Sequence, residues 1–352
     1  MPQSHRIPLQ PLQGFDWSSL TGNVASAAAY FSSDYMYAFA DAWTFSCFTE
    51  HGSKAIPSLG QESVLYNTSY DQILKWTRLD YRMERYLPAE EALAMIRIEL
   101  AQGHPVLVKG DTYRCPWFPA DYGRLHRPHF YLITGYDDLT NHLFCTDVAY
   151  MTYHQAQTVS DFSLGFAGDL LTLRPNHDQY SQPAQLPTLY EVLTRRATAN
   201  LGLGDEAYSA FDSMRNMADG WIELDRLAAE QQLHSAADMN PLNLELLYIV
   251  QARMQFLQLL EQKRDAKDSF MEQITTAFNE TVRSWTLIRK SYLHSFEPRV
   301  QREPLLSLIA ERIRATAALE QSLAESILHS NRLKEIMNSY QQQAGRAAKR
   351  EL

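Results

Sequence analysis

Cysteine is scarce in this chain of 352 residues, and basic charge does not dominate it. The three cysteines, Cys47, Cys115 and Cys145, are widely spaced and odd in number, which argues against a disulfide framework and favours a reducing cytoplasm. No run approaches the ~18–20 apolar residues of a membrane span, and the N-terminus lacks the basic-then-apolar layout of a signal peptide. The net charge of −9 argues against general nucleic-acid binding, which needs a basic surface. We therefore expect a cytoplasmic protein that binds neither nucleic acid nor membrane.

Hydrophobic residues make up 45% of the chain and charged residues 21%, which is the composition of a core-forming protein. At ~100–200 residues per domain, the length favours two domains. The polar stretch 176–187 carries two prolines and is typical of a linker. The sequence therefore predicts one domain at 1–178 and a second at 186–352.

The first half mixes helical and strand patterns. Residues 89–102 follow Pro88 and precede Gly103, the usual boundary residues of a helix. The segments 129–134 and 142–146 flank a turn-rich stretch and predict a β-hairpin. Two further strands are predicted at 105–109 and 170–173. The pattern is that of an α+β domain.

The second half is helical in pattern. Asn240 and Pro241 form an N-cap followed by proline at the first helical position. Because no glycine or proline lies between Pro241 and Pro298, we expect one helix over 241–296, and another from Pro304. A helix of that length would leave an apolar stripe uncovered, so we expect a homodimer built by this half. The stripe consists of Met271, Ile274, Phe278 and Trp285.

Ser19 stands where an apolar helical pattern begins. A serine at this position is often an N-cap, because its hydroxyl accepts a hydrogen bond from the first exposed N–H groups. It is also where a nucleophile is favoured, because the positive end of the helix dipole stabilises developing negative charge. The segment alone leaves both interpretations open.

His129 and Asp147 stand near the open end of the predicted hairpin. Counted from Leu139 as the midpoint, His129 lies ten residues before it and Asp147 eight after. Residues equidistant from the turn of an antiparallel pair lie side by side, so these two side chains are within reach of each other. A carboxylate there could orient the imidazole and stabilise its cationic form, as in a nucleophile–His–acid triad.

The order of these residues resembles the papain-like arrangement, with Gln13 six positions before Ser19, then a distant histidine and an acid on the next strand. Within that superfamily the sequence resembles the N-terminal domain of butirosin biosynthesis protein H and its relatives. The resemblance covers roughly residues 10–175. The stretches that carry it are 19–26, 105–113, 129–138 and 146–147.

This resemblance implies a papain-like α+β fold and an acyltransferase. It places Ser19 as the nucleophile, His129 as the general base, Asp147 as the orienting acid and Gln13 as the oxyanion donor. It also implies a carrier protein that presents the acyl group as a phosphopantetheine thioester, an amine of an antibiotic-type molecule as acceptor, and no bound cofactor.

The family has a cysteine where this chain has Ser19; the adjacent Ser18 is its equivalent if the register shifts by one. A cysteine can wait as a thiolate beside imidazolium, whereas a serine must lose its proton to the base during attack. The chain is then a natural serine variant, a non-catalytic binding protein, or a variant whose cysteine was deliberately replaced. A thioester hydrolase or peptidase is a further alternative.

Other residues are weaker candidates. Cys47 and Cys115 are alternative nucleophiles, although a buried structural thiol is the commoner role for Cys47 in its aromatic surroundings. A local basic island could contact a carrier protein or its phosphopantetheine, and solvated loop charges are the alternative. No HExxH or paired CxxC motif occurs, so no metal site is predicted. The basic island comprises Arg114, Arg124, His126 and Arg127.

Overall fold

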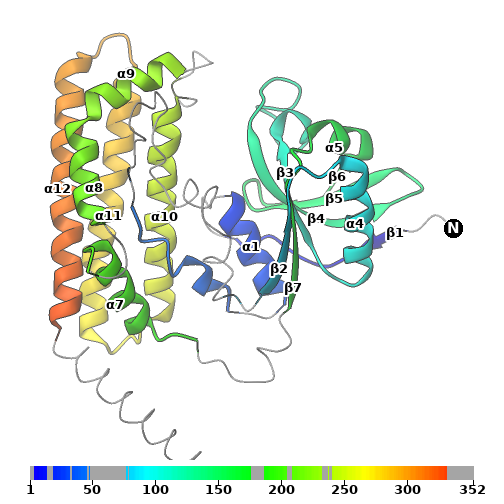
Figure 1. Cartoon of the computed structure of the whole chain (residues 1–352), viewed down its shortest axis with the longest axis horizontal. Helices are drawn as coiled ribbons and strands as arrows, with labels where there is room; N and C mark the ends of the chain where they lie inside the picture. The colour runs from blue at the N-terminus through cyan, green and yellow to red at the C-terminus, as the bar shows by residue number, and fades with distance from the viewer. Residues whose placement is uncertain are drawn as a thin grey trace, which may run out of the picture. The chain divides into compact units, whose positions relative to one another are not determined.

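A computed structural model describes residues 4–13, 19–31, 34–45, 47, 77, 79–175, 186–203, 208–231, 237 and 240–330. These residues group into two compact units, within Met1–Ala40 and Ser69–Leu186 and within Asp41–Thr68 and Pro187–Leu352. The first unit combines a sheet with helices, and the described regular elements of the second are all helices (Figure 1). The predicted α+β domain and helical domain are confirmed.

An antiparallel sheet forms the centre of the first unit (Figure 1). Its strand order is β2-β7-β3-β4-β5-β6, and β1 pairs with β4 in addition. The predicted hairpin is the β4–β5 pair. The strands are β1 (Ser4–Arg6), β2 (Leu79–Glu84), β3 (Val106–Asp111), β4 (Pro128–Asp137), β5 (His142–Asp147), β6 (Thr152–Thr158) and β7 (Leu170–Pro175).

Helix α1 (Ser19–Tyr30) contacts β4 and is buried along most of its length, from Leu20 to Ala28. Its small side chains let the helix approach the sheet closely, because glycine, alanine and serine add little width to a helix surface. Helix α4 (Ala89–Ala101) contacts β3 and β4. The other helical segments among the described residues of this unit are η1 (Tyr35–Phe39), η2 (Thr112–Arg114) and α5 (Val159–Gly165).

Six helices make up the described part of the second unit. Asn240 caps α10 as predicted, since its Oδ1 accepts from the backbone N–H groups of Leu242 (3.0 Å) and Asn243 (3.3 Å). The helices are α7 (Leu189–Asn200), α8 (Ala210–Asp219), α9 (Trp221–Gln231), α10 (Pro241–Lys263), α11 (Ser269–His294) and α12 (Arg302–His329).

The prediction of one helix over 241–296 is wrong. The helix ends at Lys263, Arg264 is extended, and a new helix begins at Ser269. Asp268 caps the new helix, because its Oδ1 accepts from the N–H groups of Phe270 (3.1 Å) and Met271 (3.2 Å). A capping aspartate therefore makes the break that the absence of glycine and proline seemed to exclude.

This break allows α11 to lie against α10 and α12 within the same unit. The apolar stripe that we expected to need a partner molecule is buried inside the chain. Its four members, Met271, Ile274, Phe278 and Trp285, are each at most 3% exposed. The physical reason for expecting a homodimer therefore does not hold, and the oligomeric state stays a prediction.

The segment 41–45 belongs to the helical unit. The division expected from the sequence, 1–178 and 186–352, placed it in the first domain. Trp43 explains this placement. Its ring is fully buried and lies 5.6 Å from that of Phe256 and 5.4 Å from that of Phe278. Burial of this large aromatic side chain among the helices stabilises the packing of segment 41–45 in the second unit, although the segment lies between two parts of the first unit in the sequence.

Candidate functional site

His129 and Asp147 form a buried pair at one end of β4 and β5. His129 Nε2 lies 2.6 Å from Asp147 Oδ2. The histidine is 8% exposed and the aspartate is fully buried. Because an ionised carboxylate only accepts hydrogen bonds, Nε2 carries the hydrogen in this pair and Nδ1 is left as the basic nitrogen.

An irregularity in β4 puts these two side chains on the same face of the sheet. Near the turn Gly135 pairs with Phe144, a register that would bring Asp147 opposite Leu132 if it continued. The register instead shifts by one residue, and Leu132 pairs with Thr146. Since successive side chains of a strand point to opposite faces, this shift places Asp147 on the face of His129.

Four donors surround the carboxylate of Asp147. Oδ2 accepts from His129 and from Trp117 Nε1 (3.0 Å), and Oδ1 accepts from the N–H of Ala149 (3.1 Å) and from Asn23 Nδ2 (3.4 Å). Burial by itself raises the pKa of Asp147, but His129 and these hydrogen bonds outweigh it and lower the pKa below its ordinary value. The residue is therefore held ionised beside the imidazole.

Ser19 is the first residue of α1, and its hydroxyl faces the start of β4. Ser19 Oγ accepts from the N–H of Phe130 at 3.4 Å. That nitrogen belongs to the peptide bond after His129, so the serine oxygen lies next to the histidine. No hydrogen bond joins Ser19 to the His129 ring within the described part of the chain.

Asn23 links the three elements that carry these residues, and the sequence reasoning missed it. Its Nδ2 donates to the carbonyl oxygens of Ser19 (2.7 Å) and Phe130 (3.0 Å), and its Oδ1 accepts from the N–H of Val148 (3.3 Å). With its contact to Asp147, this fully buried amide joins α1, β4 and the end of β5. The available signal was an asparagine one helical turn after Ser19 in an otherwise small and apolar helix.

Comparison with known families gives a match over this region. Residues 16–148 match the family described as "Butirosin biosynthesis protein H, N-terminal". Over these residues the chain is similar to this family. The resemblance seen in the sequence is thereby confirmed. No curated protein matches the chain.

Two predicted positions lie outside this cluster, Gln13 and the alternative Ser18. Gln13 is just upstream of the match and exposed, and no hydrogen bond joins it to Ser19 or His129 among the described residues. Ser18 lies outside the described residues. The oxyanion role of Gln13 and the alternative register at Ser18 stay predictions.

The two alternative cysteine nucleophiles lack activation. Burial raises the pKa of Cys115, with further raising by Asp147 and Asp111, and its thiol lies 3.4 Å from the carbonyl oxygen of Asp111. Burial and Glu245 raise the pKa of Cys47 to about 11. Nucleophilic cysteines need a lowered pKa, so Ser19 is the better candidate.

The predicted basic island is partly neutralised. Arg114 lies 3.4 Å from Asp161, and Arg127 lies 3.4 Å from Asp121. Arg124 is exposed, and its side chain has no ion pair in the described residues. His126 Nδ1 contacts Asp111 Oδ2 at 2.5 Å. The net positive charge that remains for a carrier protein is therefore small.

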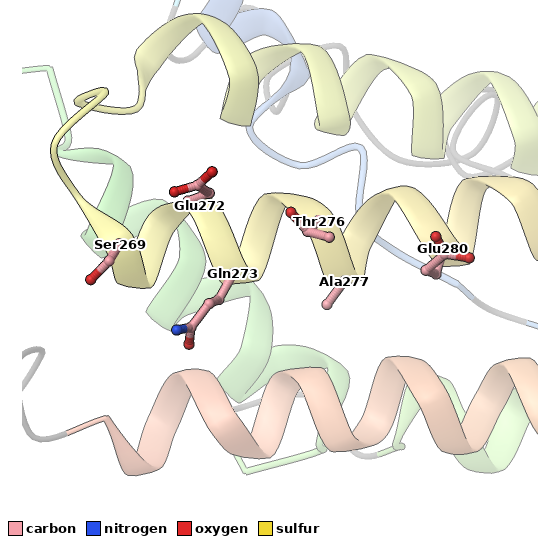
Figure 2. Close-up of a pocket in the computed structure, with 6 residues that line it drawn as sticks. All are labelled: Ser269, Glu272, Gln273, Thr276, Ala277 and Glu280. Carbon is pink, nitrogen blue, oxygen red and sulfur yellow. The ribbon is translucent and has the colours of Figure 1, made fainter.

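Three further observations concern metals, membranes and ligands. Among the described residues, no group of three histidine, cysteine, aspartate or glutamate side chains is placed to hold a metal ion. No described helix is long and apolar enough to cross a membrane. A surface hollow of about 460 Å³ lies on α11 of the helical unit. Figure 2 shows the side chains that line it, and all of them come from α11. They are Ser269, Glu272, Gln273, Thr276, Ala277 and Glu280.

Proposed function

We propose that the chain is an acyltransferase of specialised-metabolite biosynthesis. It moves an acyl or aminoacyl group from a carrier-protein phosphopantetheine thioester to an amine. The observation that carries this proposal is the buried His129–Asp147 pair at 2.6 Å with the Ser19 hydroxyl beside it. The family match adds that the namesake of the domain belongs to butirosin biosynthesis. The free thiols suit a reducing cytoplasm, where we place the reaction.

In the first step Ser19 Oγ attacks the thioester carbonyl carbon while its proton passes to His129 Nδ1. Asp147 stabilises the imidazolium that forms, because its carboxylate is buried, ionised and bonded to Nε2. The C–S bond then breaks, and the pantetheine sulfur takes the proton from Nδ1. The result is an acyl ester on Ser19 and a free carrier-protein thiol.

In the second step an amine attacks the ester carbonyl and gives its proton to His129 Nδ1. The C–O bond breaks, Ser19 regains the proton, and the product is an amide. Gln13 would donate to the oxyanion in both steps, a role carried over from the family resemblance. These two steps need no bound cofactor, because the pantetheine arrives on the carrier protein.

Ser19→Cys and Ser19→Ala test the proposal with an acyl-carrier thioester. We expect intact-mass spectrometry to show more trapped acyl-enzyme on the cysteine variant than on the unaltered chain, and none on the alanine variant. A cysteine is more nucleophilic, because the thiolate can preform beside imidazolium. Adding an amine should release the acyl group as an amide.

Other outcomes identify the alternatives. Binding of the carrier protein without any adduct on the cysteine variant would indicate a non-catalytic binding protein. Release of the acyl group at the same rate with and without amine would indicate a thioester hydrolase or peptidase. His129→Ala serves as a control, since it should abolish the adduct while leaving the nucleophile in place.

A further inference from the structure

A row of aromatic rings leads from His129 to the protein surface. The Phe118 ring stands edge-on to the His129 ring, with centroids 4.5 Å apart, and the Tyr150 ring stands edge-on to Phe118 at 4.6 Å. His129 (8% exposed) and Phe118 (7%) are buried, whereas Tyr150 at the end of the row is 49% exposed. The three residues come from three different segments, so this row is a feature of the folded unit and not of one local sequence.

The turn that carries Tyr150 begins directly after Asp147. Met151, the next residue, is 41% exposed and has a left-handed backbone (φ 51°), which non-glycine residues adopt at an energetic cost. The turn thus holds two large apolar side chains at the surface, although burial would stabilise them more. Ligand-binding sites combine apolar and aromatic lining with a few polar groups, and Phe118 and Tyr150 beside His129 offer this combination.

The chemistry of the proposed reaction indicates which part of a substrate meets this wall. His129 must pass a proton to the atom that leaves, so the leaving group lies on the imidazole side of the scissile bond. For a thioester donor the leaving group is the pantetheine thiol. Phe118 is the aromatic ring in contact with the imidazole, and Tyr150 extends the same wall outward.

We infer that Phe118 and Tyr150 bind the pantetheine arm of the donor thioester. The arm is a linear chain of methylene and amide groups, which can pack against aromatic edges and faces. The inference rests on the proposed function for the identity of the donor, but binding of the arm can be measured without turnover.

Tyr150→Ala tests the wall, and Tyr153→Ala is the matched control. Tyr153 lies in β6, directly after the turn that carries Tyr150, and is 45% exposed. Its ring stacks on His154, with centroids 4.0 Å apart, and not on Phe118. The probe is free pantetheine, titrated against the full chain by ligand-observed NMR. We expect Tyr150→Ala to weaken binding about threefold to tenfold, the range of a single aromatic contact, and Tyr153→Ala to leave it unchanged.

Equal affinity of the unaltered chain and Tyr150→Ala would overturn the inference, and so would absence of pantetheine binding by the unaltered chain. An equal loss in Tyr153→Ala would do the same. Acetyl-pantetheine with hydroxylamine as a small acceptor gives a second readout, in which Tyr150→Ala should raise KM and leave kcat nearly unchanged. If Tyr150→Ala weakens pantetheine binding but Ser19→Cys forms no acyl adduct, the binding role of Phe118 and Tyr150 stands and the proposed acyl transfer is contradicted.

Discussion

At the scale of single residues, the site depends on polar contacts that keep Asp147 ionised and orient the His129 ring. The hairpin count brought His129 near Asp147 without any knowledge of the register shift in β4, because both residues stand at the open end of the strands. That shift, and not the count, puts them on one face. Asn23 could not be predicted, because an asparagine in a helix is more often a solvated residue than a link between three elements.

The lowered pKa of Asp147 makes acid stability a measure of this pair. The ionised form stabilises the folded state above the unfolded pKa of about 3.9, and this contribution is lost as the pH falls through the lower folded pKa. We expect Asp147→Asn to lower the free energy of unfolding at pH 7 by about 1.5–3 kcal/mol, the range of a hydrogen bond to a charged group. Below about pH 4 its stability should change less with pH than that of the unaltered chain.

Urea unfolding between pH 3 and pH 7 measures both effects. Asp138→Asn is a suitable control, because Asp138 pairs with Arg97 on the surface at 3.1 Å and should change stability little. An acid slope of Asp147→Asn equal to that of the unaltered chain would show that Asp147 is not held ionised by its partners.

At the scale of the elements, the sequence predicts strands and helices that have apolar runs and clear boundary residues. It fails for strands with few apolar residues and for a helix break made by a capping side chain. The strands β3, β4, β5 and β7 and the helix α4 follow from apolar runs and boundary residues. Strands β2 and β6 carry alternating polar residues with few apolar ones and were not recognised. The break between α10 and α11 depends on Asp268, and an aspartate reads as an ordinary solvated residue in a helical pattern.

A buried charge network joins the segment 41–45 to the helices. Glu320 of α12 is fully buried and accepts from Trp43 Nε1 (2.9 Å), Trp285 Nε1 (2.8 Å) and Arg253 Nε (2.9 Å). Arg253 Nη1 donates to the carbonyl oxygen of Thr44 at 2.6 Å. Both charges are fully paired, so the network holds the segment in a single position.

Removal of one partner should be costly. We expect Glu320→Ala to destabilise the helical unit by about 3–5 kcal/mol, because it leaves the Arg253 charge buried and unpaired. The double variant Arg253→Met, Glu320→Leu should recover only part of that loss. It removes the unpaired charge, but it leaves the Nε1 groups of Trp43 and Trp285 without an acceptor. Denaturant unfolding followed by tryptophan fluorescence measures both. Glu223→Ala, which removes the exposed ion pair between Glu223 and Arg226, is the control. A double variant as unstable as Glu320→Ala would contradict this account.

At the scale of the whole molecule, the chain is not divided by a single cut. The family match over residues 16–148 includes the segment 41–45, which packs within the helical unit. Deleting residues 187–352 would leave Trp43 and the backbone oxygens that Arg253 binds without their partners. Tests of the proposed acyl transfer therefore need the full chain.

The oligomeric state is a property of the whole molecule for which sequence and structure give different expectations. The sequence suggested a homodimer, because a continuous helix over 241–296 would expose Met271 and Trp285. The structure folds that segment back at Arg264 and buries both side chains within one chain. The large apolar residues that stay exposed on α11 and α12 are Leu287 on the former and Leu308 and Leu319 on the latter. A few exposed apolar side chains are normal on a monomer surface. We therefore expect light scattering at micromolar concentration to report the mass of one chain. A mass of two chains would show that another surface associates, and Leu308→Lys would test whether α12 takes part in it.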